Sequence, residues 1–190
     1  MQRRIPAKLI AIPAGLLAAW IGFEGFSPHP YVPTKGDVPT IGHGSTYYED
    51  GTRVTLADPP ISRQRAAQLA KHELEVTYGT CVRNSLGNTP ITETEFKLAL
   101  GFAGQYGCGG WKSGPFVTHL KSGQYKKYCE AFLGYKYMTS DKKLGAGWEP
   151  YSASNGKIRY RFDCSTPGNK QCRGVWTRQL SRYNECIAAL

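Results

Sequence analysis

Apolar residues recur at helical spacing in two segments of the first half of the chain. Residues 62–76, "SRQRAAQLAKHELEV", follow the N-cap Ser62 and place their apolar positions on one helical face. Residues 92–107, "TETEFKLALGFAGQYG", begin with Thr92 and carry Glu95 three residues later, the spacing of a capping box. The apolar positions of the two faces are Ala66, Leu69, Ala70, Leu74 and Phe96, Leu100, Ala103. Two amphipathic helices are therefore predicted.

The rest of the chain divides into turn-rich and helical stretches. Residues 31–55 are dense in Gly, Pro, Thr and Tyr, and the turns "TKGD" and "EDGT" predict a small antiparallel hairpin lobe. The later pattern predicts a glycine turn at 107–110, helices over 115–123 and 125–137, an irregular stretch over 139–172 and a last helix over 173–190. The predicted fold class is α+β, mostly helical, with the hairpin lobe inserted after the first helix.

The N-terminal segment allows two interpretations. Arg3, Arg4 and Lys8 precede a weakly apolar run over 9–23, which is broken by Pro13 and is short against the ~20 apolar residues of a bilayer span. The segment resembles the charged and apolar regions of a signal peptide, but no small-residue cleavage site follows before Glu24. Either an uncleaved export segment that later leaves the membrane or an ordinary amphipathic core helix fits this pattern.

Charge indicates a polyanionic partner. The 190 residues include 24 Lys and Arg against 14 Asp and Glu, a net charge of +10 that is scattered along the chain. Nucleic acid, an anionic membrane surface and the acidic bacterial wall all match this surplus, and so does a merely soluble basic surface.

Six cysteines form an even set without a C-x-x-C pair, which argues against zinc ribbons and thioredoxin-like motifs. Their scattered spacing favours disulfides in an oxidising compartment, and six reduced, buried thiols are the alternative. Of the fifteen pairings that six cysteines allow, we choose three. They are Cys81 with Cys108, Cys129 with Cys186, and Cys164 with Cys172.

Other catalytic chemistries lack their motifs. The histidines have no H-E-x-x-H or other paired spacing, so no metal site is expected. No G-x-S-x-G elbow and no phosphate loop occur, and we expect no cofactor.

Glu24 is the candidate general acid. It follows Trp20, Ile21 and Phe23, and an apolar surrounding disfavours the ionised form of a carboxyl group. Glycoside cleavage also needs a group across the substrate that stabilises positive charge or positions water, and the hairpin that follows supplies Asp37 and Thr40.

The motifs "EGF", "PY" and "TIGHGST", in this order, resemble the glutamate, aspartate and threonine signature of the phage-type lysozymes, the T4-like glycoside hydrolases. The segment "ISRQRAAQLAKHELE" is similar to their helix between the lobes, "FKLALGFAGQYGCGG" to their central helix and glycine turn, and "RGVWTRQLSRYNEC" to their closing helix. The resemblance implies a lysozyme-like two-lobed fold in a single domain, 1–190. Residues 30–57 would form the hairpin lobe and 62–190 the helical lobe, and 1–23 would be an export segment of the signal-anchor-release kind, continuous with the catalytic helix.

The resemblance further implies a bacteriophage endolysin that hydrolyses the β-1,4 bond between N-acetylmuramic acid and N-acetylglucosamine in peptidoglycan and so lyses the host cell. Its partner would be peptidoglycan and not nucleic acid. We expect a monomer that is exported to the host periplasm by way of a membrane-tethered form, with a transient association with the inner membrane.

One departure from the family pattern concerns the second catalytic position. Pro33 stands where the family has aspartate, and one extra residue precedes Thr40. Either Asp37 serves from the shifted turn, or Thr34 takes the place of the carboxylate. The predicted substrate-binding residues are Thr34, His43, Tyr47, Gln105 and Tyr106.

Two alternative functions stay open at this point. A lytic transglycosylase needs only one acid, Glu24, because a hydroxyl of the sugar attacks; its product would carry an anhydro end in place of a free reducing end. A non-enzymatic basic module that binds membrane, wall or nucleic acid would keep its killing activity after Glu24→Gln.

Overall fold

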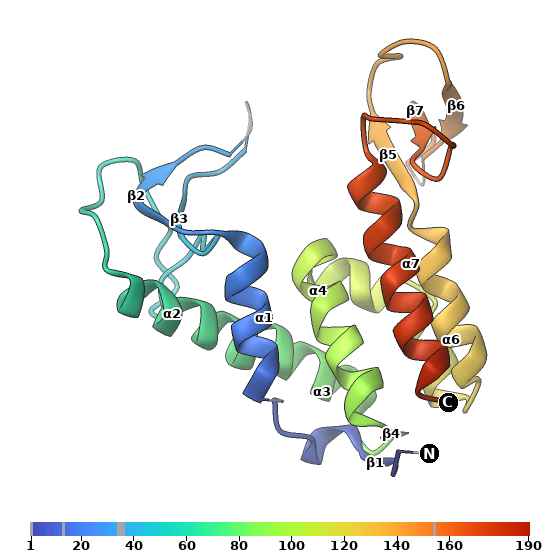
Figure 1. Ribbon diagram of the computed structural model, residues 1–190, viewed down its shortest axis with the longest axis horizontal. Helices are drawn as coiled ribbons and strands as arrows, with labels where there is room; N and C mark the ends of the chain where they lie inside the picture. Colours follow the sequence, from blue (N-terminus) through green and yellow to red (C-terminus); the bar gives the residue numbers. More distant parts are fainter. Residues whose placement is uncertain (1, 13, 34–36, 154) are drawn as a thin grey trace. The chain divides into compact units, whose positions relative to one another are not determined.

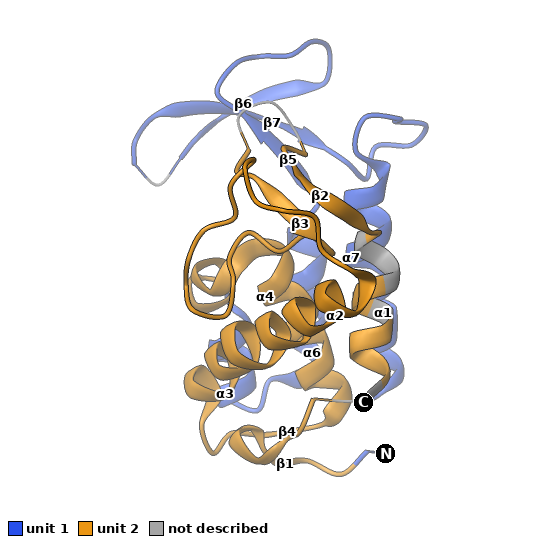
Figure 2. Ribbon diagram, turned by 90° about the vertical axis from the view of Figure 1, so that its left-hand side faces the viewer, with its two compact units in different colours: residues 1–2, 115–190 blue, residues 3–114 orange. Residues whose placement is uncertain are grey.

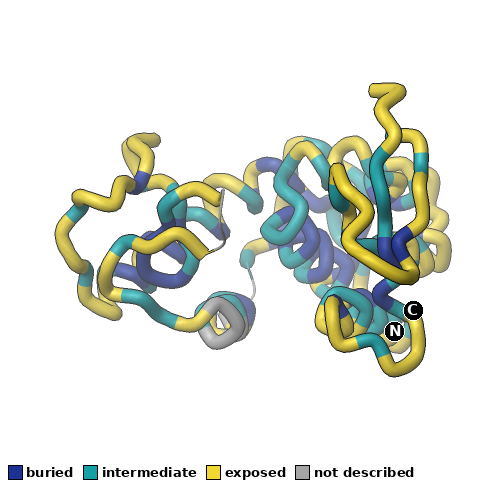
Figure 3. The backbone as a smooth tube through the Cα atoms, turned by 90° about the horizontal axis from the view of Figure 1, so that it is seen from above, coloured by how far each residue is buried: buried dark blue, intermediate teal, exposed yellow. Residues whose placement is uncertain are grey.

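The computed structural model describes residues 2–12, 14–33, 37–153 and 155–190. Its backbone forms two compact units, residues 3–114 and residues 115–190, with residues 1–2 assigned to the second (Figures 1 and 2). Buried positions concentrate on the helices of each unit, whereas loops and hairpin ends are exposed (Figure 3). The fold is α+β and mostly helical, as expected from the sequence.

The unit formed by residues 3–114 is built mainly on helices. Its longer helical segments are α1 (Ala14–Glu24), α2 (Arg63–His72), the π-helix η2 (Glu73–Gly79), α3 (Thr80–Leu86) and α4 (Glu93–Ser113). The predicted caps are present: the Ser62 hydroxyl accepts a hydrogen bond from the Arg65 N–H at 3.1 Å, and Thr92 and Glu95 form a capping box. These caps satisfy N–H groups that a helix end leaves without partners. The helix after Ser62 continues through η2 and α3 as far as Leu86.

The glycine turn predicted at 107–110 is confirmed in part: the helix breaks at Gly107, and a second helical stretch of α4 continues to Ser113. Only Gly107 departs from helical geometry, with a φ of 73°, a left-handed conformation that glycine adopts without steric cost. The turn is reduced to a kink, and the Cys81–Cys108 disulfide joins α3 to α4 beside it.

The predicted hairpin is present but short. Strands β2 (Ser27–Tyr31) and β3 (Thr40–Gly42) pair antiparallel, with Ser27 opposite Gly42 and Tyr31 opposite Thr40. A small core of Ile41, Val54 and Leu69 joins the hairpin region to α2. At Gly42 a Cβ atom would lie 2.8 Å from Cβ of Ala66, so only glycine allows β3 to approach α2 this closely.

The first residues do not join the helix that the apolar run suggested. Strand β1 (Ile5–Pro6) pairs with β4 (Pro90–Ile91), and a short 3-10 turn, η1 (Ala7–Leu9), follows. Ala7 and Ile10 are buried, and the Arg83 guanidinium donates two hydrogen bonds to the Ile10 carbonyl, so the start of the apolar run is held apart from α1. Among the described residues, no helix is long and apolar enough to cross a membrane.

The unit of residues 115–190 packs helices around aromatic rings. Its helical segments are α5 (Phe116–Lys121), α6 (Tyr125–Ala131), the 3-10 turn η3 (Phe132–Gly134) and α7 (Arg173–Ala188). The ring of Phe116 lies 4.9 Å from that of Phe132 and 5.9 Å from that of Tyr128, measured between centroids. Aromatic pairs at these distances add to the stabilisation from area burial.

The irregular stretch predicted over 139–172 is wrong. Three strands form a sheet in the order β5-β7-β6: β5 (Tyr137–Ser140), β6 (Trp148–Ser152) and β7 (Ile158–Asp163). The helix predicted over 125–137 accordingly ends early, at Ala131. Side chains of β7 alternate between the two faces of the sheet, and its inner Phe162 packs with Trp148 in a cluster that includes Val175 and Trp176. Strands of four to six residues carry too few repeats for this alternation to stand out in the sequence.

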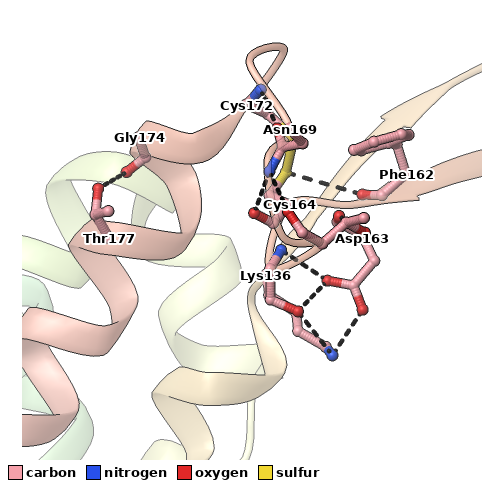
Figure 4. Close-up of a disulfide and its surroundings, with 10 residues drawn as sticks. Lys136, Phe162, Asp163, Cys164, Asn169, Cys172, Gly174 and Thr177 are labelled. Carbon is pink, nitrogen blue, oxygen red and sulfur yellow. Dashed lines mark hydrogen bonds and ion pairs between the residues drawn. A yellow bond between two sulfur atoms is a disulfide. The ribbon is translucent and has the colours of Figure 1, made fainter. Parts of the chain in front are cut away.

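All three disulfides match the pairs chosen from the sequence. Besides Cys81–Cys108, Cys129–Cys186 joins α6 to α7, and Cys164–Cys172 closes the loop between β7 and α7. Figure 4 shows this last disulfide beside Asn169, whose side-chain amide donates a hydrogen bond to the Cys164 carbonyl at 2.7 Å. A loop this short still gains about 2–3 kcal/mol from cross-linking in the chain-entropy account.

Candidate active site

The end of α1 determines where the predicted acid lies. Glu24 is the last residue of α1, and Gly25 follows with a φ of 71°, which ends the helix and turns the chain into β2. A helix commonly ends on a glycine in this left-handed conformation because no Cβ opposes it. The side chain of Glu24 lies outside the described part of the structure. Its backbone ends α1, three residues before β2 begins at Ser27.

His43 ties the hairpin to this helix end. The ring is 5% exposed, and its Nδ1 forms a hydrogen bond with the carbonyl oxygen of Gly25. Because a carbonyl oxygen only accepts, Nδ1 carries the hydrogen in this arrangement. The centroid of this ring lies 5.6 Å from that of Phe26. The Arg63 guanidinium lies over the other ring, 4.4 Å from the Phe26 centroid. The predicted substrate residue His43 therefore holds the backbone next to Glu24.

Thr40 and Asp37 differ in their environments. Thr40 begins β3, is 5% exposed, and its hydroxyl donates a hydrogen bond to the Val38 carbonyl at 3.4 Å. Asp37 is exposed in the loop before β3. Thr34, the other candidate for the second position, lies outside the described residues. The hairpin thus fixes Thr40 firmly and leaves Asp37 facing solvent.

Trp20 anchors α1 to α4, a contact that the sequence did not indicate. A Cβ atom at Gly104 would overlap the six-membered ring of Trp20, so the indole lies directly on the backbone of α4. The same indole lies 5.7 Å from the ring of Tyr78, between centroids. Trp20 lies one helical turn before Glu24 in the sequence of α1.

A second line of contacts runs from the hairpin through the π-helix. The Tyr78 hydroxyl donates a hydrogen bond to the Glu73 carboxylate at 3.1 Å, and the Ser45 hydroxyl donates to its other oxygen at 3.5 Å. A π-helix closes backbone hydrogen bonds between residues five apart, which is the separation of Glu73 and Tyr78. The carboxylate of Glu73 is therefore linked to the hairpin at Ser45 and, through Tyr78, to Trp20. Sequence reasoning missed Glu73, and no motif marked it.

The remaining residues predicted to contact sugar lie on α4 and in the hairpin lobe. Gln105 and Tyr106 directly follow Gly104 on α4 and are half-buried, and the Tyr106 ring stacks on Phe102 at 4.5 Å. Tyr47 is 47% exposed, and the Arg53 guanidinium lies 5.2 Å from its ring centroid. Gln105 and Tyr106 therefore adjoin the Trp20 contact, whereas Tyr47 lies on the outer part of the hairpin lobe.

The other carboxylates of the hairpin lobe are committed to structure. Arg65 donates to both oxygens of Glu49 at 2.6 and 2.7 Å, and this hydrogen bonding lowers the pKa of Glu49. Hydrogen bonds from Thr55 lower the pKa of Asp58. Burial, with the hydrogen bond to Asp58, raises the pKa of Tyr48. Carboxyl groups with lowered pKa values stay ionised near neutral pH and do not donate protons.

In the described part of the chain, no cluster of three or more His, Cys, Asp or Glu side chains could hold a metal ion. The functional residues predicted from the sequence, where described, all lie in residues 3–114, in one unit.

Comparisons with known proteins give the family. The model of the phage lysozyme family matches residues 21–148, about two thirds of the chain. No curated protein matches it in sequence. The endolysin of Escherichia coli O157:H7 phage FAHEc1 is similar in structure, with a TM-score of 0.67, 17% identity, and 96% of each chain covered.

Two further solved structures share the fold. The muramidase domain of SpmX from Asticaccaulis excentricus has a TM-score of 0.63 at 14% identity and covers 93% of this chain and 97% of its own. A mutant of P22 lysozyme has a TM-score of 0.60 at 17% identity, covering 94% and 99%. These structures support the fold, and the family model carries the assignment. The chain belongs to the phage lysozyme family and is a peptidoglycan-cleaving enzyme of the glycosidase type.

Proposed function

We propose that this protein hydrolyses the β-1,4 bond between N-acetylmuramic acid and N-acetylglucosamine and acts as a bacteriophage endolysin that lyses the host cell. The observation that supports the proposal is that the backbone on both sides of Glu24 is held in place. Its helix is anchored to α4 through Trp20 and Gly104, and its following carbonyl is bound by His43. Gly25, His43 and Gly104 lie within residues 21–148, which match the family model, and Trp20 directly precedes them.

In this mechanism the carboxyl group of Glu24 donates its proton to the leaving glycosidic oxygen. The transition state then carries positive charge on the sugar ring, which a carboxylate or a positioned water on the opposite side stabilises. Asp37 or Thr34 would supply that group, and Thr40 would orient the attacking water from the rigid β3 position. His43, Gln105, Tyr106 and Tyr47 would contact the sugars.

The proposed place of action is the host periplasm. Each unit contains disulfides of its own, Cys81–Cys108 in residues 3–114 and the other two in residues 115–190, and disulfides persist in oxidising compartments such as the bacterial periplasm. We propose export through the N-terminal segment, by way of a membrane-tethered form, after which residues 2–12 occupy their place beside β4.

The test of the acid is Glu24→Gln, which keeps the shape of the side chain but cannot donate a proton. We expect turnover of purified peptidoglycan to fall by at least ~10²-fold, the lower bound of general acid catalysis, with an unchanged circular dichroism spectrum. Glu93→Gln is the matched control, since Glu93 is exposed in the first turn of α4. Activity of Glu24→Gln within a few-fold of the parent protein would remove Glu24 from the mechanism.

Product analysis separates hydrolysis from the transglycosylase alternative. The exposed position of Asp37 keeps that alternative in view, because a reaction by the sugar's own hydroxyl needs only one acid. Mass spectrometry of the fragments should show free reducing ends, one water heavier than anhydro ends. Anhydro-muramyl products would overturn the hydrolytic mechanism while leaving Glu24 as the acid.

A further inference from the structure

The β5-β7-β6 sheet has one packed face and one open face. Along β7, Tyr160 and Phe162 pack inward with the cluster that includes Trp148 and Trp176. The alternate residues point to the other face, since successive side chains of a strand alternate. There Arg161 lies between Thr139 of β5 and Glu149 of β6, Arg159 lies opposite Tyr151, and Asp163 opposite Tyr137. We call the side chains of Tyr137, Tyr151, Arg159 and Arg161 the outer face.

Arg161 is the centre of the outer face. Its guanidinium lies 4.4 Å from the ring centroid of Tyr137 and 5.8 Å from that of Tyr151. The Nε atom is buried and has no hydrogen-bond partner among the described residues. A guanidinium held against aromatic rings is oriented in advance, so it loses little freedom when its N–H groups bind a carboxylate. The two tyrosines are half-buried, which leaves part of each ring accessible.

Charge around the outer face is positive but mixed. Residues 136–163 include six basic and three acidic side chains, a net charge of +3. Two pairs are internal: Lys136 with Asp163 and Arg159 with Asp141, each at 2.7 Å. Figure 4 shows the first pair next to the Cys164–Cys172 disulfide, which fixes the end of β7. The amino groups of Lys142, Lys143 and Lys157, in the loops at the strand ends, have no ion pair among the described residues and remain available.

Accessible aromatic rings beside a pre-oriented guanidinium suit a ligand with both sugar rings and carboxylates. The C–H face of a sugar packs on an aromatic ring by burying apolar surface, while a carboxylate accepts charge-assisted hydrogen bonds. Glu149 stands directly opposite Arg161 and repels any anion, but a closely spaced row of phosphates would meet this repulsion more than carboxylates set apart along a glycan, so nucleic acid fits less well.

We propose that the outer face binds the carboxylate-bearing glycan strands of peptidoglycan and is a second wall contact, separate from the residues assigned to catalysis. The identity of the glycan rests on the proposed function; the chemistry of the face rests on its own residues. Most of β6 and all of β7 lie beyond residue 148, where the family match ends.

The test measures adsorption to purified, insoluble peptidoglycan in the full-length Glu24→Gln background, by depletion of protein from the supernatant. Arg161→Gln should weaken adsorption about tenfold and Tyr151→Ala to a similar degree, whereas Tyr151→Phe, which keeps the ring, should bind normally. The matched control is Arg178→Gln, an exposed position on α7 of the same unit that loses the same charge. Thermal melting of each variant shows whether the sheet remains folded.

Parallel adsorption to neutral chitin, phosphatidylglycerol vesicles and single-stranded DNA identifies the ligand class. The proposal predicts that Arg161→Gln weakens adsorption to peptidoglycan and leaves adsorption to the other three materials unchanged. Equal losses for Arg161→Gln and Arg178→Gln would show that only net charge matters, and a loss confined to vesicles or DNA would assign the face to those ligands; either result overturns the proposal. Reducing ends are assayed in the same tubes. If Glu24→Gln still released them, the catalytic assignment would fail, while the comparison of adsorption would stand.

Discussion

At the scale of single residues, the candidate site depends on backbone contacts more than on side-chain pairs. The backbone that follows Glu24 is held by two features: the left-handed Gly25 ends the helix, and His43 binds the Gly25 carbonyl from the hairpin region. A general acid must be held precisely in its productive position, because misplacement by about 1 Å can cost ~10²-fold in rate. The hydrogen bond from His43 restrains this part of the chain.

The second catalytic position can be resolved by two substitutions. If Asp37 stabilises the positive charge of the transition state, Asp37→Asn should lower kcat by ~10²-fold or more and leave KM nearly unchanged. Thr40→Ala should also lower kcat, because the hydroxyl that orients water is lost. Steady-state kinetics on solubilised peptidoglycan fragments measure both constants. The control is Asp50→Asn, an exposed aspartate whose hydrogen bonds are to Thr52 in the outer turn of the lobe.

A normal Asp37→Asn beside an impaired Thr40→Ala would contradict the role of Asp37. The exposure of Asp37 gives that result a physical basis, since an exposed carboxylate interacts weakly with charge across the high dielectric of water. The role would then pass to Thr34, the alternative left open by the sequence.

Motif order gave the candidate residues, but their neighbours depended on tertiary structure. His43 was predicted as a residue that contacts the sugar, whereas its hydrogen bond to Gly25 requires the register of β2 and β3, with Ser27 opposite Gly42. Glu73 and Tyr78 meet because η2 is a π-helix, and no periodicity rule anticipates that rare geometry. The sequence does not indicate the Trp20 contact either, since the contact depends on glycine, which has no side chain, at position 104 of a different helix.

At the scale of elements, the anchoring of α1 to α4 can be tested at that glycine. In an open helix position, Gly→Ala is stabilising by roughly 0.5–1 kcal/mol, because alanine loses less conformational entropy. At Gly104 the new Cβ would overlap the Trp20 ring, and overpacking typically costs about 1–3 kcal/mol. We therefore expect Gly104→Ala to lower the free energy of unfolding by about 1–2 kcal/mol and to reduce activity by displacing α1.

The matched control is Gly109→Ala, on the same helix, where nothing lies within 4 Å of the added Cβ. It should be neutral or slightly stabilising by urea denaturation. If Gly104→Ala were as stable and as active as Gly109→Ala, the contact between Trp20 and α4 would have no part in holding the end of α1.

Among the elements, those with local signals were predicted and those without were missed. The capped helices at Ser62 and Thr92 have both an N-cap and an apolar face within one segment, so the sequence contains their full signal. The three-stranded sheet depends on pairing between β5 and β7 across about twenty residues, and its strands are joined by loops rich in Gly and Lys. The glycine-rich sequence at 107–110 likewise marked the break in α4, but it did not show that only Gly107 leaves helical geometry.

At the scale of the whole molecule, the net charge of +10 should govern the encounter with the wall. Attraction between a cationic protein and an anionic polymer acts over a distance that salt screens, with a Debye length of ~10 Å at 0.1 M ionic strength. Lysis of whole cells should therefore slow several-fold between about 0.02 and 0.3 M sodium chloride. Bond cleavage within the site involves groups in direct contact and should depend on salt far less.

A short neutral chitooligosaccharide separates these two effects, provided that the enzyme cleaves it. Its hydrolysis, followed by released reducing ends, should change less than twofold over the same range of salt, because no polyanion is being attracted. Thermal melting at each salt concentration checks that the fold is equally stable throughout. If both substrates lost activity in parallel, electrostatic attraction would not be the cause. The salt-sensitive feature would then lie in the folded protein itself, and the partly buried Arg4–Glu95 ion pair, which joins the first residues to α4, would be the first candidate to test.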